Sequence, residues 1–317
     1  MRDMFVKTLL NIAKKDRNVY LITGDLGFGV LKPFWEEIPN QFVNVGIAEQ
    51  NMIGFAAGMA LEGKTVFVYS IGNFPTLRCV EQIRNDCAYH NANVKIVCIG
   101  GGLVYGALGM SHHATEDLAI MRALPEVTVM APADLVETEH ATRAIYEHKG
   151  TCYLRLGRGG EGQIHNTIDN FRIGKAIKIK DGEDIVIFST GAIIDEVMEV
   201  NSMLKEKGRN PGIYTFPTVK PIDAKVIEEC SSQYDLIVTV EEHNKIGGFG
   251  SAVAEVVSEL NGKRAKMLKI GIDDQYSSVV GSQKYLRDYY QLSSPKIFEN
   301  IISSITSLTK ECEQLEA

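Results

Sequence analysis

Short apolar runs alternate with amphipathic segments of helical period along almost the whole chain. In the first half, the apolar runs cover 19–23, 42–45, 65–69, 94–99, 128–130 and 152–156. A Gly-rich, polar stretch without periodicity follows at 157–170, and the alternation resumes at 184. Alternation of this kind is typical of βαβ units with parallel strands. The pattern predicts an α/β fold with two consecutive α/β domains and largely parallel sheets, over 1–160 and 181–317, with a linker over 161–180.

The segments between the apolar runs predict helices. In the first half, these helices cover 1–15, 53–61, 75–90, 116–124 and 134–147. Pro75 stands in the first turn of the longest one, where a helix tolerates proline. Asp134 is expected to cap the last one by accepting a hydrogen bond from a backbone N–H group of the first turn.

Charge and composition narrow the classes of partner. The 317 residues carry a formal net charge of −7 and no Lys/Arg-rich run, which argues against nucleic acid and anionic membranes. The longest apolar runs fall short of the about 18 residues that a transmembrane helix needs, and residues 1–7 do not read as a signal peptide. The six cysteines form no Cys-x-x-Cys pair, which favours reduced thiols and a cytoplasmic location.

Four loops of unusual sequence follow four different predicted strands of the first domain. They are 24–29, the turn at Glu49, 70–74 and 100–113. In a parallel sheet such loops meet at the carboxyl edge, where open α/β folds bind their ligands. Glu49 stands where a strand gives way to a helix rich in Gly and Ala, so its carboxylate is a candidate for that site. It could equally complement the helix dipole without any further function.

Two adjacent histidines, His112 and His113, stand in the last of these loops. No further His or carboxylate at metal-binding spacing accompanies them, so a metal site is not expected. One of the pair could offer its imidazole to a substrate for proton transfer or hydrogen bonding. The alternative is that both merely flank a helix that Thr115 would cap.

Several motifs, taken in order, are similar to those of a known family. They are Asn44-Val-Gly-Ile-Ala-Glu-Gln-Asn-Met52, Phe55-Ala-Ala-Gly-Met-Ala60, Glu81-Gln-Ile-Arg-Asn85, Thr115-Glu-Asp-Leu-Ala-Ile-Met-Arg-Ala-Leu-Pro125, Pro132-Ala-Asp134 and Tyr153-Leu-Arg-Leu-Gly-Arg158. Together they resemble the carboxy-terminal half of transketolase. The resemblance covers nearly the whole chain, since residues 1–160 resemble the pyrimidine-binding domain and the region from about 180 resembles the carboxy-terminal domain.

The resemblance implies thiamine diphosphate as the cofactor, which reacts through the C2 carbanion of its thiazolium ring. It implies that the Glu49 carboxylate hydrogen-bonds the aminopyrimidine ring and favours the imino form that removes the C2 proton. The other implied site residues are the catalytic His112, the cofactor-binding Phe74, Ile47, Leu26 and Asp25, and the substrate-binding Arg158, Arg2 and His113.

The resemblance also implies a partner. The family holds the diphosphate and its divalent metal in a separate domain with a Gly-Asp-Gly…Asn pattern, whereas this chain has Gly24-Asp25-Leu26. A split transketolase is therefore expected, in which an N-terminal subunit carries the diphosphate site with Mg²⁺ (or Ca²⁺ or Mn²⁺). Two copies of each chain would form a heterotetramer, and this chain alone would be inactive.

Four departures from the family pattern concern the substrate. Gly72 replaces the aromatic residue that stacks on the pyrimidine, which leaves Phe74 for that role. The stretch Gly106-Ala-Leu-Gly109 replaces Gly-Glu-Asp-Gly and so loses a contact to the acceptor sugar. Gly100 and Gly29 stand where many transketolases have a His and a Ser. These changes predict a roomier, less polar pocket and a non-standard sugar substrate.

The resulting interpretation is transfer of a two-carbon ketol unit from a ketose donor to an aldose acceptor. Two other thiamine diphosphate enzymes are alternatives, namely the β subunit of a 2-oxo acid dehydrogenase and a deoxyxylulose-phosphate-synthase-like ligase. The Glu-Asp-Leu-Ala-Ile-Met-Arg segment and the His112 loop favour transketolase. A non-catalytic assembly subunit is a further alternative, because the acceptor contacts are lost. The sequence does not identify the sugars, their phosphorylation or the partner.

Overall fold

A seven-stranded sheet organises the first domain, in the order β10-β5-β6-β4-β3-β1-β2. The computed structural model describes residues 1–262 and 264–316. Neighbouring strands of this sheet are parallel except β10 and β5, which are antiparallel. The strands are β1 (Val19–Thr23), β2 (Phe42–Asn44), β3 (Thr65–Ile71), β4 (Val94–Ile99), β5 (Val127–Met130), β6 (Thr151–Leu156) and β10 (Thr218–Lys220).

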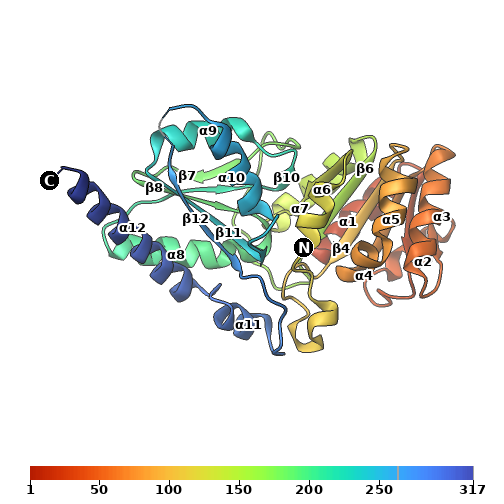
Figure 1. Cartoon of the computed structure of the whole chain (residues 1–317). Coiled ribbons are helices and arrows are strands. Elements are labelled where there is room, and N and C mark those ends of the chain that lie inside the picture. Colours follow the sequence, from red (N-terminus) through yellow and green to blue (C-terminus); the bar gives the residue numbers. More distant parts are fainter. Residues whose placement is uncertain (263, 317) are drawn as a thin grey trace.

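Helices cover both faces of this sheet (Figure 1), which explains why β4 and β6 are buried along their whole length. One face packs apolar side chains against α1 (Arg2–Ala13), α2 (Lys32–Glu37) and α7 (Leu135–Glu147). The other face packs against α3 (Glu49–Leu61) and α6 (Asp117–Ala123). Asp134 caps α7 as predicted, since its side chain accepts a hydrogen bond from the Glu137 backbone N–H.

The second domain has a five-stranded sheet in the order β12-β11-β8-β9-β7, parallel except for the pair β7 and β9. Its strands are β7 (Ile177–Lys180), β8 (Ile185–Ser189), β9 (Gly212–Thr215), β11 (Leu236–Asn244) and β12 (Lys266–Ile272). Its helices are α8 (Ile194–Glu206), α9 (Ala224–Gln233), α10 (Phe249–Glu259), α11 (Gln283–Tyr289) and α12 (Ser294–Glu316). Two α/β domains with mostly parallel sheets confirm the predicted fold class.

The two domains share both a strand and a core. Strand β10 follows β9 of the second sheet in sequence, yet it pairs with β5 of the first sheet. Neither β10 nor β7 was predicted, because runs of three or four residues carry too little periodicity. The Phe216 ring lies 4.9 Å from that of Phe188 and 5.1 Å from that of Phe249, within an apolar cluster that also contains residues of α3 and α6. The domains are therefore joined by a continuous apolar core.

The prediction of one long helix over 75–90 was wrong. The segment consists of α4 (Asn73–Thr76), a 3₁₀ turn (Leu77–Cys79), the short α5 (Val80–Gln82) and a π-helix (Ile83–Ala88). The Thr76 hydroxyl donates back to the Gly72 carbonyl, and the Cys79 thiol donates to the Phe74 carbonyl. These bonds satisfy the carbonyl groups locally and compete with a regular α-helical ladder.

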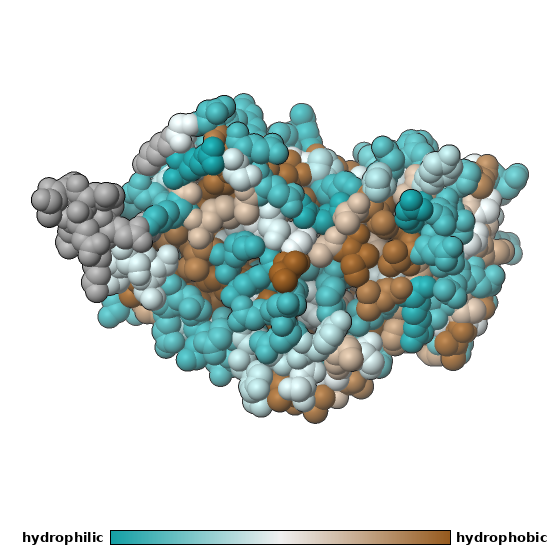
Figure 2. Space-filling view, in the orientation of Figure 1, coloured by the Kyte–Doolittle hydropathy of each residue, from teal (hydrophilic) through white to brown (hydrophobic). Residues whose placement is uncertain are grey.

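Apolar side chains gather on one face of the first domain, over α4 and α5 (Figure 2). Large apolar residues of the first domain that are exposed include Ile47, Phe55, Leu61 and Leu77.

Within the described residues, no helix combines the length and apolarity that crossing a membrane requires.

Candidate active site

The four unusual loops lie at one edge of the first sheet, as predicted. They follow β1, β2, β3 and β4, which are adjacent and parallel, so their carboxyl ends face the same way. The side chain of Asn44 ties two of the loops together. Its Oδ1 accepts from the backbone N–H groups of Asp25 and Gly46, and its Nδ2 donates to the Asp25 carboxylate over 3.1 Å. Both Asp25 and Gly46 have positive φ, so these turns are held in an uncommon backbone conformation beside Glu49.

Glu49 is the first residue of α3, and its side chain is only 7% exposed. Its Oε2 lies 3.2 Å from Nη1 of Arg78, and both residues line an open cavity of about 450 Å³. Gly24 is needed on the other side of Glu49, because a Cβ at that position would lie 3.2 Å from the Gly46 carbonyl oxygen. The arrangement presents one buried carboxylate at the wall of a cavity that is large enough for a heterocycle.

A line of neighbouring side chains runs from Arg78 away from Glu49. The Arg78 guanidinium carbon lies 4.2 Å from the centre of the Phe74 ring, as in a cation–π contact. The Phe74 ring meets the His112 ring edge-on, with the two centres 5.2 Å apart. The Ser111 hydroxyl lies 3.0 Å from Nδ1 of His112, which leaves Nε2 for another partner.

Tyr105 extends this line to a pair of arginines. Its ring centre lies 6.4 Å from that of His112, and the Arg158 guanidinium carbon lies 5.3 Å from it. Burial raises the pKa of the Tyr105 phenol, while the charges of Arg158 and the half-buried Arg2 oppose that rise. We call this set the site row, and it consists of Glu49, Arg78, Phe74, His112, Tyr105 and Arg158.

The expectation of a roomier pocket is wrong at Gly100, because Tyr105 fills the space beside it. A Cβ on Gly100 would lie 2.1 Å from the Tyr105 ring, and the backbone there has φ +86°. Gly72 is equally constrained, since a Cβ there would lie 2.7 Å from the Cβ of Ala114. Sequence reasoning missed Tyr105, whose ring compensates for a glycine five residues earlier. By contrast, Leu108 is exposed at the loop surface, which agrees with a less polar rim.

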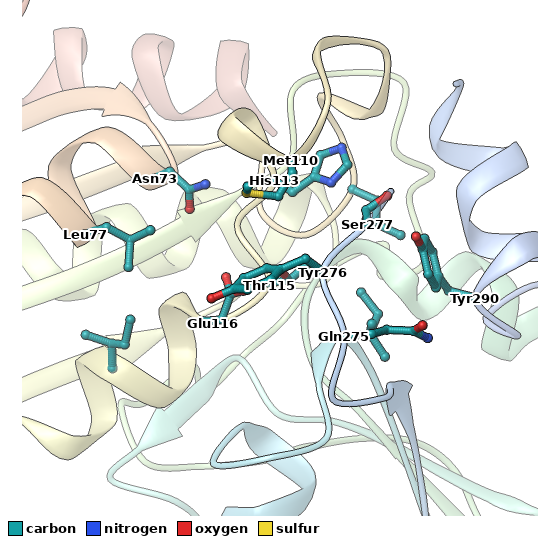
Figure 3. A pocket seen from close by; sticks show the side chains of 13 residues that line it. Asn73, Leu77, Met110, His113, Thr115, Glu116, Gln275, Tyr276, Ser277 and Tyr290 are labelled. Atoms are coloured by element: carbon teal, nitrogen blue, oxygen red, sulfur yellow. The ribbon is translucent and has the colours of Figure 1, made fainter. Parts of the chain in front are cut away.

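The remaining predicted site residues lie at different places. Leu26 is half-buried and receives a hydrogen bond on its carbonyl oxygen from the Thr23 hydroxyl. Ile47 is 76% exposed beside Glu49. His113 does not face the site row: its ring lines a separate cavity between the domains (Figure 3).

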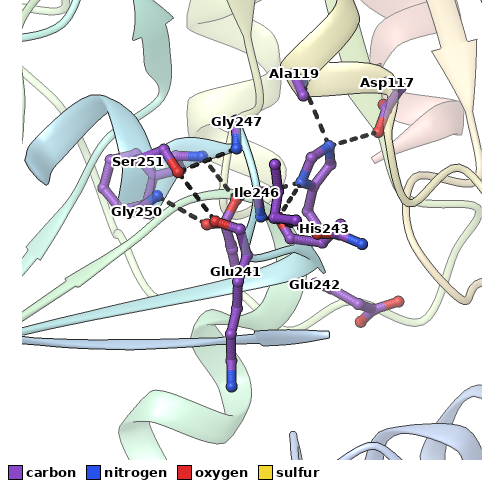
Figure 4. A network of polar contacts seen from close by, with 12 residues as sticks. Asp117, Ala119, Glu241, Glu242, His243, Ile246, Gly247, Gly250 and Ser251 are labelled. Carbon is purple, nitrogen blue, oxygen red and sulfur yellow. Dashed lines mark hydrogen bonds and ion pairs between the residues drawn. The ribbon is translucent and has the colours of Figure 1, made fainter. Parts of the chain in front are cut away.

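A buried polar network behind the loops joins the two domains (Figure 4). The Asp117 carboxylate accepts from the Tyr153 hydroxyl and from Nε of Arg155, while Nη2 of Arg155 donates to the carbonyl oxygens of Ala114 and Glu242. In the second domain, His243 lies between the backbone N–H of Ala119 and the Asn244 carbonyl oxygen. This network fixes the start of α6 and the end of the His112 loop. Sequence reasoning missed this network, because the only sign of it in the sequence is a few polar residues within apolar segments.

Comparison with known proteins identifies the family. The description "Transketolase, pyrimidine binding domain" matches residues 1–160, and "Transketolase, C-terminal domain" matches residues 174–297. The chain belongs to the transketolase family. This transketolase chain is 41% identical over 308 residues to a putative transketolase C-terminal section from Methanocaldococcus jannaschii, and the match covers 96% of each.

Two further similar proteins are described as a transketolase subunit and as a split gene transketolase. The chain is 34% identical to one of the subunits of an apulose-4-phosphate transketolase from Phocaeicola vulgatus, over 96% of this chain and 97% of that one. A solved structure described as a split gene transketolase, inactive beta4 tetramer, superimposes with a TM-score of 0.86 at 32% identity, over 96% of this chain and 97% of that chain. The transketolase chain thus has the length and fold of a separate carboxy-terminal subunit.

The residues present fit one half of thiamine diphosphate, the cofactor that the transketolase family implies. A buried carboxylate and an aromatic ring, Glu49 and Phe74, are linked through Arg78 at an open cavity, which is the chemistry that an aminopyrimidine ring needs. Among the described residues, no group of three or more His, Cys, Asp or Glu side chains is placed to hold a metal ion. The residues that fit the cofactor in this chain are thus those suited to its pyrimidine end.

Proposed function

We propose that this chain is the small, pyrimidine-binding subunit of a thiamine diphosphate-dependent transketolase that transfers a two-carbon ketol unit between sugars. The observation that carries this proposal is the site row, in which a buried carboxylate, an aromatic ring, a histidine and an arginine follow one another along one sheet edge. When bound, the cofactor supplies the nucleophilic carbon and the electron sink.

Glu49 would hold the proton at the pyrimidine ring. A buried carboxylate placed at a helix start can share a proton with a ring nitrogen without competition from bulk water. Phe74 would support the ring through its face, and Arg78 would orient both groups because it contacts each of them. Leu26, Asp25 and Ile47 would complete the surroundings of the ring.

His112 and the basic end of the site row would hold the substrate. His112 has one ring nitrogen engaged by Ser111, so the other is available to a hydroxyl or carbonyl oxygen of a sugar. Arg158 is exposed and Arg2 is half-buried. Burial raises the pKa of the Tyr105 phenol, and the positive charge of each arginine opposes that rise. Two arginines at one end of the row favour a substrate with an anionic end, such as a phosphate.

The substrate would be a non-standard sugar for this family. Leu108 cannot accept a hydrogen bond from a sugar hydroxyl, and Tyr105 occupies the space beside Gly100. The relative from Phocaeicola vulgatus is named for apulose-4-phosphate, which supports an unusual sugar phosphate as the substrate class.

A partner subunit would complete the site. Ile47 and Phe28 are 76% and 63% exposed on the loops beside Glu49, and such side chains next to a catalytic carboxylate favour coverage by another chain. We propose that the partner is an N-terminal transketolase subunit that holds the diphosphate and its divalent metal, in a heterotetramer with two copies of each chain.

Reconstitution tests this function. The chain is mixed with a candidate N-terminal subunit, thiamine diphosphate and Mg²⁺, and products from a ketose phosphate and an aldehyde are identified by mass spectrometry. Ketol transfer by the mixture and none by the chain alone is the expected result. Release of CO₂ from a 2-oxo acid without ketol transfer would instead assign a decarboxylating enzyme. A complex that forms but catalyses neither reaction would point to an assembly subunit.

A further inference from the structure

A second cavity, of about 400 Å³, lies between the two domains behind the loop that carries His112. Met110 and His113 line it from the loop, and Tyr276 and Tyr290 line it from the second domain (Figure 3). None of its lining residues lines the cavity at Glu49. Cavities between domains are preferred positions for small ligands. The cavity is therefore distinct from the site row, although one loop borders both.

His113 is an unsatisfied polar group at the wall of this cavity. The residue is 2% exposed, and among the described residues neither ring nitrogen makes a hydrogen bond of good geometry, although the Gly106 backbone lies close enough to act on the ring. Burial lowers the pKa of the ring, and the nearby Gly106 backbone and Glu242 oppose that shift only in part. A neutral imidazole offers one donor and one acceptor, and leaving both unused in a buried position costs stability.

The charge of the cavity selects the class of ligand. Among the described residues that line it, Glu116 is the single carboxylate, and no lysine or arginine is present. Within the part of the chain that the structure describes, no hydrogen bond or ion pair occupies the Glu116 side chain, which is half-buried. An anionic ligand such as a sugar phosphate would meet this carboxylate without any compensating cation. A cationic ligand would neutralise it.

The other lining side chains are four neutral polar ones (Asn73, Thr115, Gln275 and Ser277) and a larger group of aromatic and apolar ones. Tyr290 is 6% exposed and Tyr276 is 71% exposed, and both line the cavity that Glu116 also lines (Figure 3). Leu77 and Ile272 contribute apolar surface to the cavity wall. Tyrosine faces attract cations through the ring quadrupole, and the apolar surface suits a hydrocarbon frame.

We propose that this interdomain cavity binds a small organic cation, a primary amine or ammonium carried on an apolar or aromatic frame. Its charged nitrogen would lie at Glu116, and its frame would lie between Tyr276 and Tyr290, in contact with the cavity wall that includes His113. The site does not depend on the transketolase assignment. A ligand there would contact the back of the loop that carries His112, so occupancy would couple to the site row.

Three probes of matched size and different charge test the proposal. Benzylamine is a cation at neutral pH, benzyl alcohol is neutral and benzoate is an anion. Binding of each to the full chain is measured by saturation-transfer NMR titration, alone and in complex with the partner subunit. Benzylamine is expected to bind roughly five- to tenfold more tightly than benzyl alcohol, and benzoate more weakly than either. Equal binding of the three probes, tighter binding of benzoate, or no binding of benzylamine at millimolar concentration would overturn the proposal.

Substitutions locate the binding. Glu116→Gln removes the charge with little change of shape and should abolish the preference for benzylamine over benzyl alcohol. Tyr276→Leu changes an exposed side chain that folding does not need, and should weaken benzylamine binding roughly fivefold. Glu228→Gln, on the exposed surface of α9, is the matched control and should leave binding unchanged. Circular dichroism checks that each variant is folded. Unchanged benzylamine affinity in folded Glu116→Gln would show that the cation binds elsewhere and would sink the proposal.

Discussion

Arg78 donates through Nη1 to Oε2 of Glu49 over 3.2 Å, which ties the buried carboxylate at the start of α3 to the irregular segment that follows β3. The Arg78 side chain is 51% exposed, so its ion pair contributes little to folding. The ion pair instead orients the Glu49 carboxylate relative to the Phe74 ring, because the same guanidinium packs on that ring. The two groups proposed to hold the pyrimidine are thus positioned by one arginine.

Replacing Arg78 should therefore affect activity more than stability. For Arg78→Met we expect turnover of the reconstituted enzyme to fall roughly tenfold, which corresponds to about 1.4 kcal/mol of lost transition-state stabilisation. The free energy of unfolding should change by less than about 1 kcal/mol. Arg78→Lys, which keeps the charge but not the planar group over Phe74, should recover only part of the activity. Wild-type turnover in Arg78→Met would contradict the positioning role.

Glu49→Gln should nearly abolish turnover and leave the fold intact. Loss of the proton-holding carboxylate is expected to lower turnover by roughly 10²–10⁴-fold, the range typical of general acid–base groups. Far-ultraviolet circular dichroism and co-purification with the partner subunit should match those of the wild type. Glu62→Gln, at the other end of the same helix and exposed, serves as the control. Near-normal turnover in Glu49→Gln would remove the basis of the proposed function.

Tyr105 should decide which substrates the enzyme accepts. Tyr105→Phe keeps the ring that packs beside Gly100 and removes the hydroxyl near the arginines, so we expect a roughly fivefold higher KM for a phosphorylated sugar at similar kcat. Tyr105→Leu opens the space and should raise activity on bulkier sugar phosphates relative to the preferred substrate. Tyr89→Phe, at a tyrosine that is 83% exposed, is the control. An unchanged substrate profile in both Tyr105 variants would show that the ring does not contact the sugar.

Much of the first domain could be predicted because most of its strands are apolar and are separated by periodic helices. The convergence of four loops at one edge followed directly from the parallel order, and Asp134 was recognisable as a helix cap. Strands β7 and β10 escaped prediction because short strands at a sheet edge are specified by tertiary pairing rather than by local pattern. The break in the segment after β3 also depends on tertiary context, since side-chain hydrogen bonds to two carbonyl groups decide it.

The site was predictable only in part. Motif similarity pointed to Glu49, Phe74 and His112, and the structure brings these three side chains into one row. The positions of Tyr105 and Arg78 could not be derived, because each depends on the path of a loop without regular structure. His113 follows His112 directly, but the loop turns the two rings toward different cavities. Adjacent residues in an irregular loop do not reveal which way each side chain points.

Asp117 should be essential for holding the two domains together. It is 1% exposed and neutralises Arg155, which is 5% exposed and bonded to backbone on both sides of the domain boundary. For Asp117→Asn we expect a loss of about 3–5 kcal/mol in the free energy of unfolding, because a buried guanidinium is left without its counter-charge. Tyr153→Phe removes only one hydrogen bond to the same carboxylate and should cost about 1–3 kcal/mol. Urea unfolding followed by fluorescence measures both, and equal small effects would contradict the role of the charge.

A second buried cluster, at the start of α7, should make stability depend on pH. Burial raises the pKa of Glu137 to about 7 against the hydrogen bonds that it accepts from Thr215 and the Ala133 backbone. Burial alone would lower the pKa of His165, but its hydrogen bond to Asp134 and the nearby Glu137 charge raise it. Hydrogen bonds from the His165 side chain and from the backbone N–H groups of His165 and Glu137 lower the pKa of Asp134 to about 2 against the effect of burial, so Asp134 loses its contribution only in strong acid.

The raised pKa values of Glu137 and His165 both make the free energy of unfolding decrease as the pH rises. Between its ordinary pKa of 4.5 and about 7, Glu137 binds more protons in the folded state than in the unfolded state, so stability falls as pH rises through this window. The contribution of His165 is fully present below its ordinary pKa of 6.5 and is lost above its raised folded value. The free energy of unfolding should thus decrease by about 2–3 kcal/mol from pH 5 to pH 8 on account of this cluster.

In Glu137→Gln the slope of the free energy of unfolding against pH should flatten, although overall stability drops because one of the two accepted hydrogen bonds is lost. Urea titrations at several pH values measure the slope, with Glu139→Gln of the same helix, where the side chain is 40% exposed, as the control. A slope in Glu137→Gln as steep as that of the control would show that Glu137 does not titrate in this range.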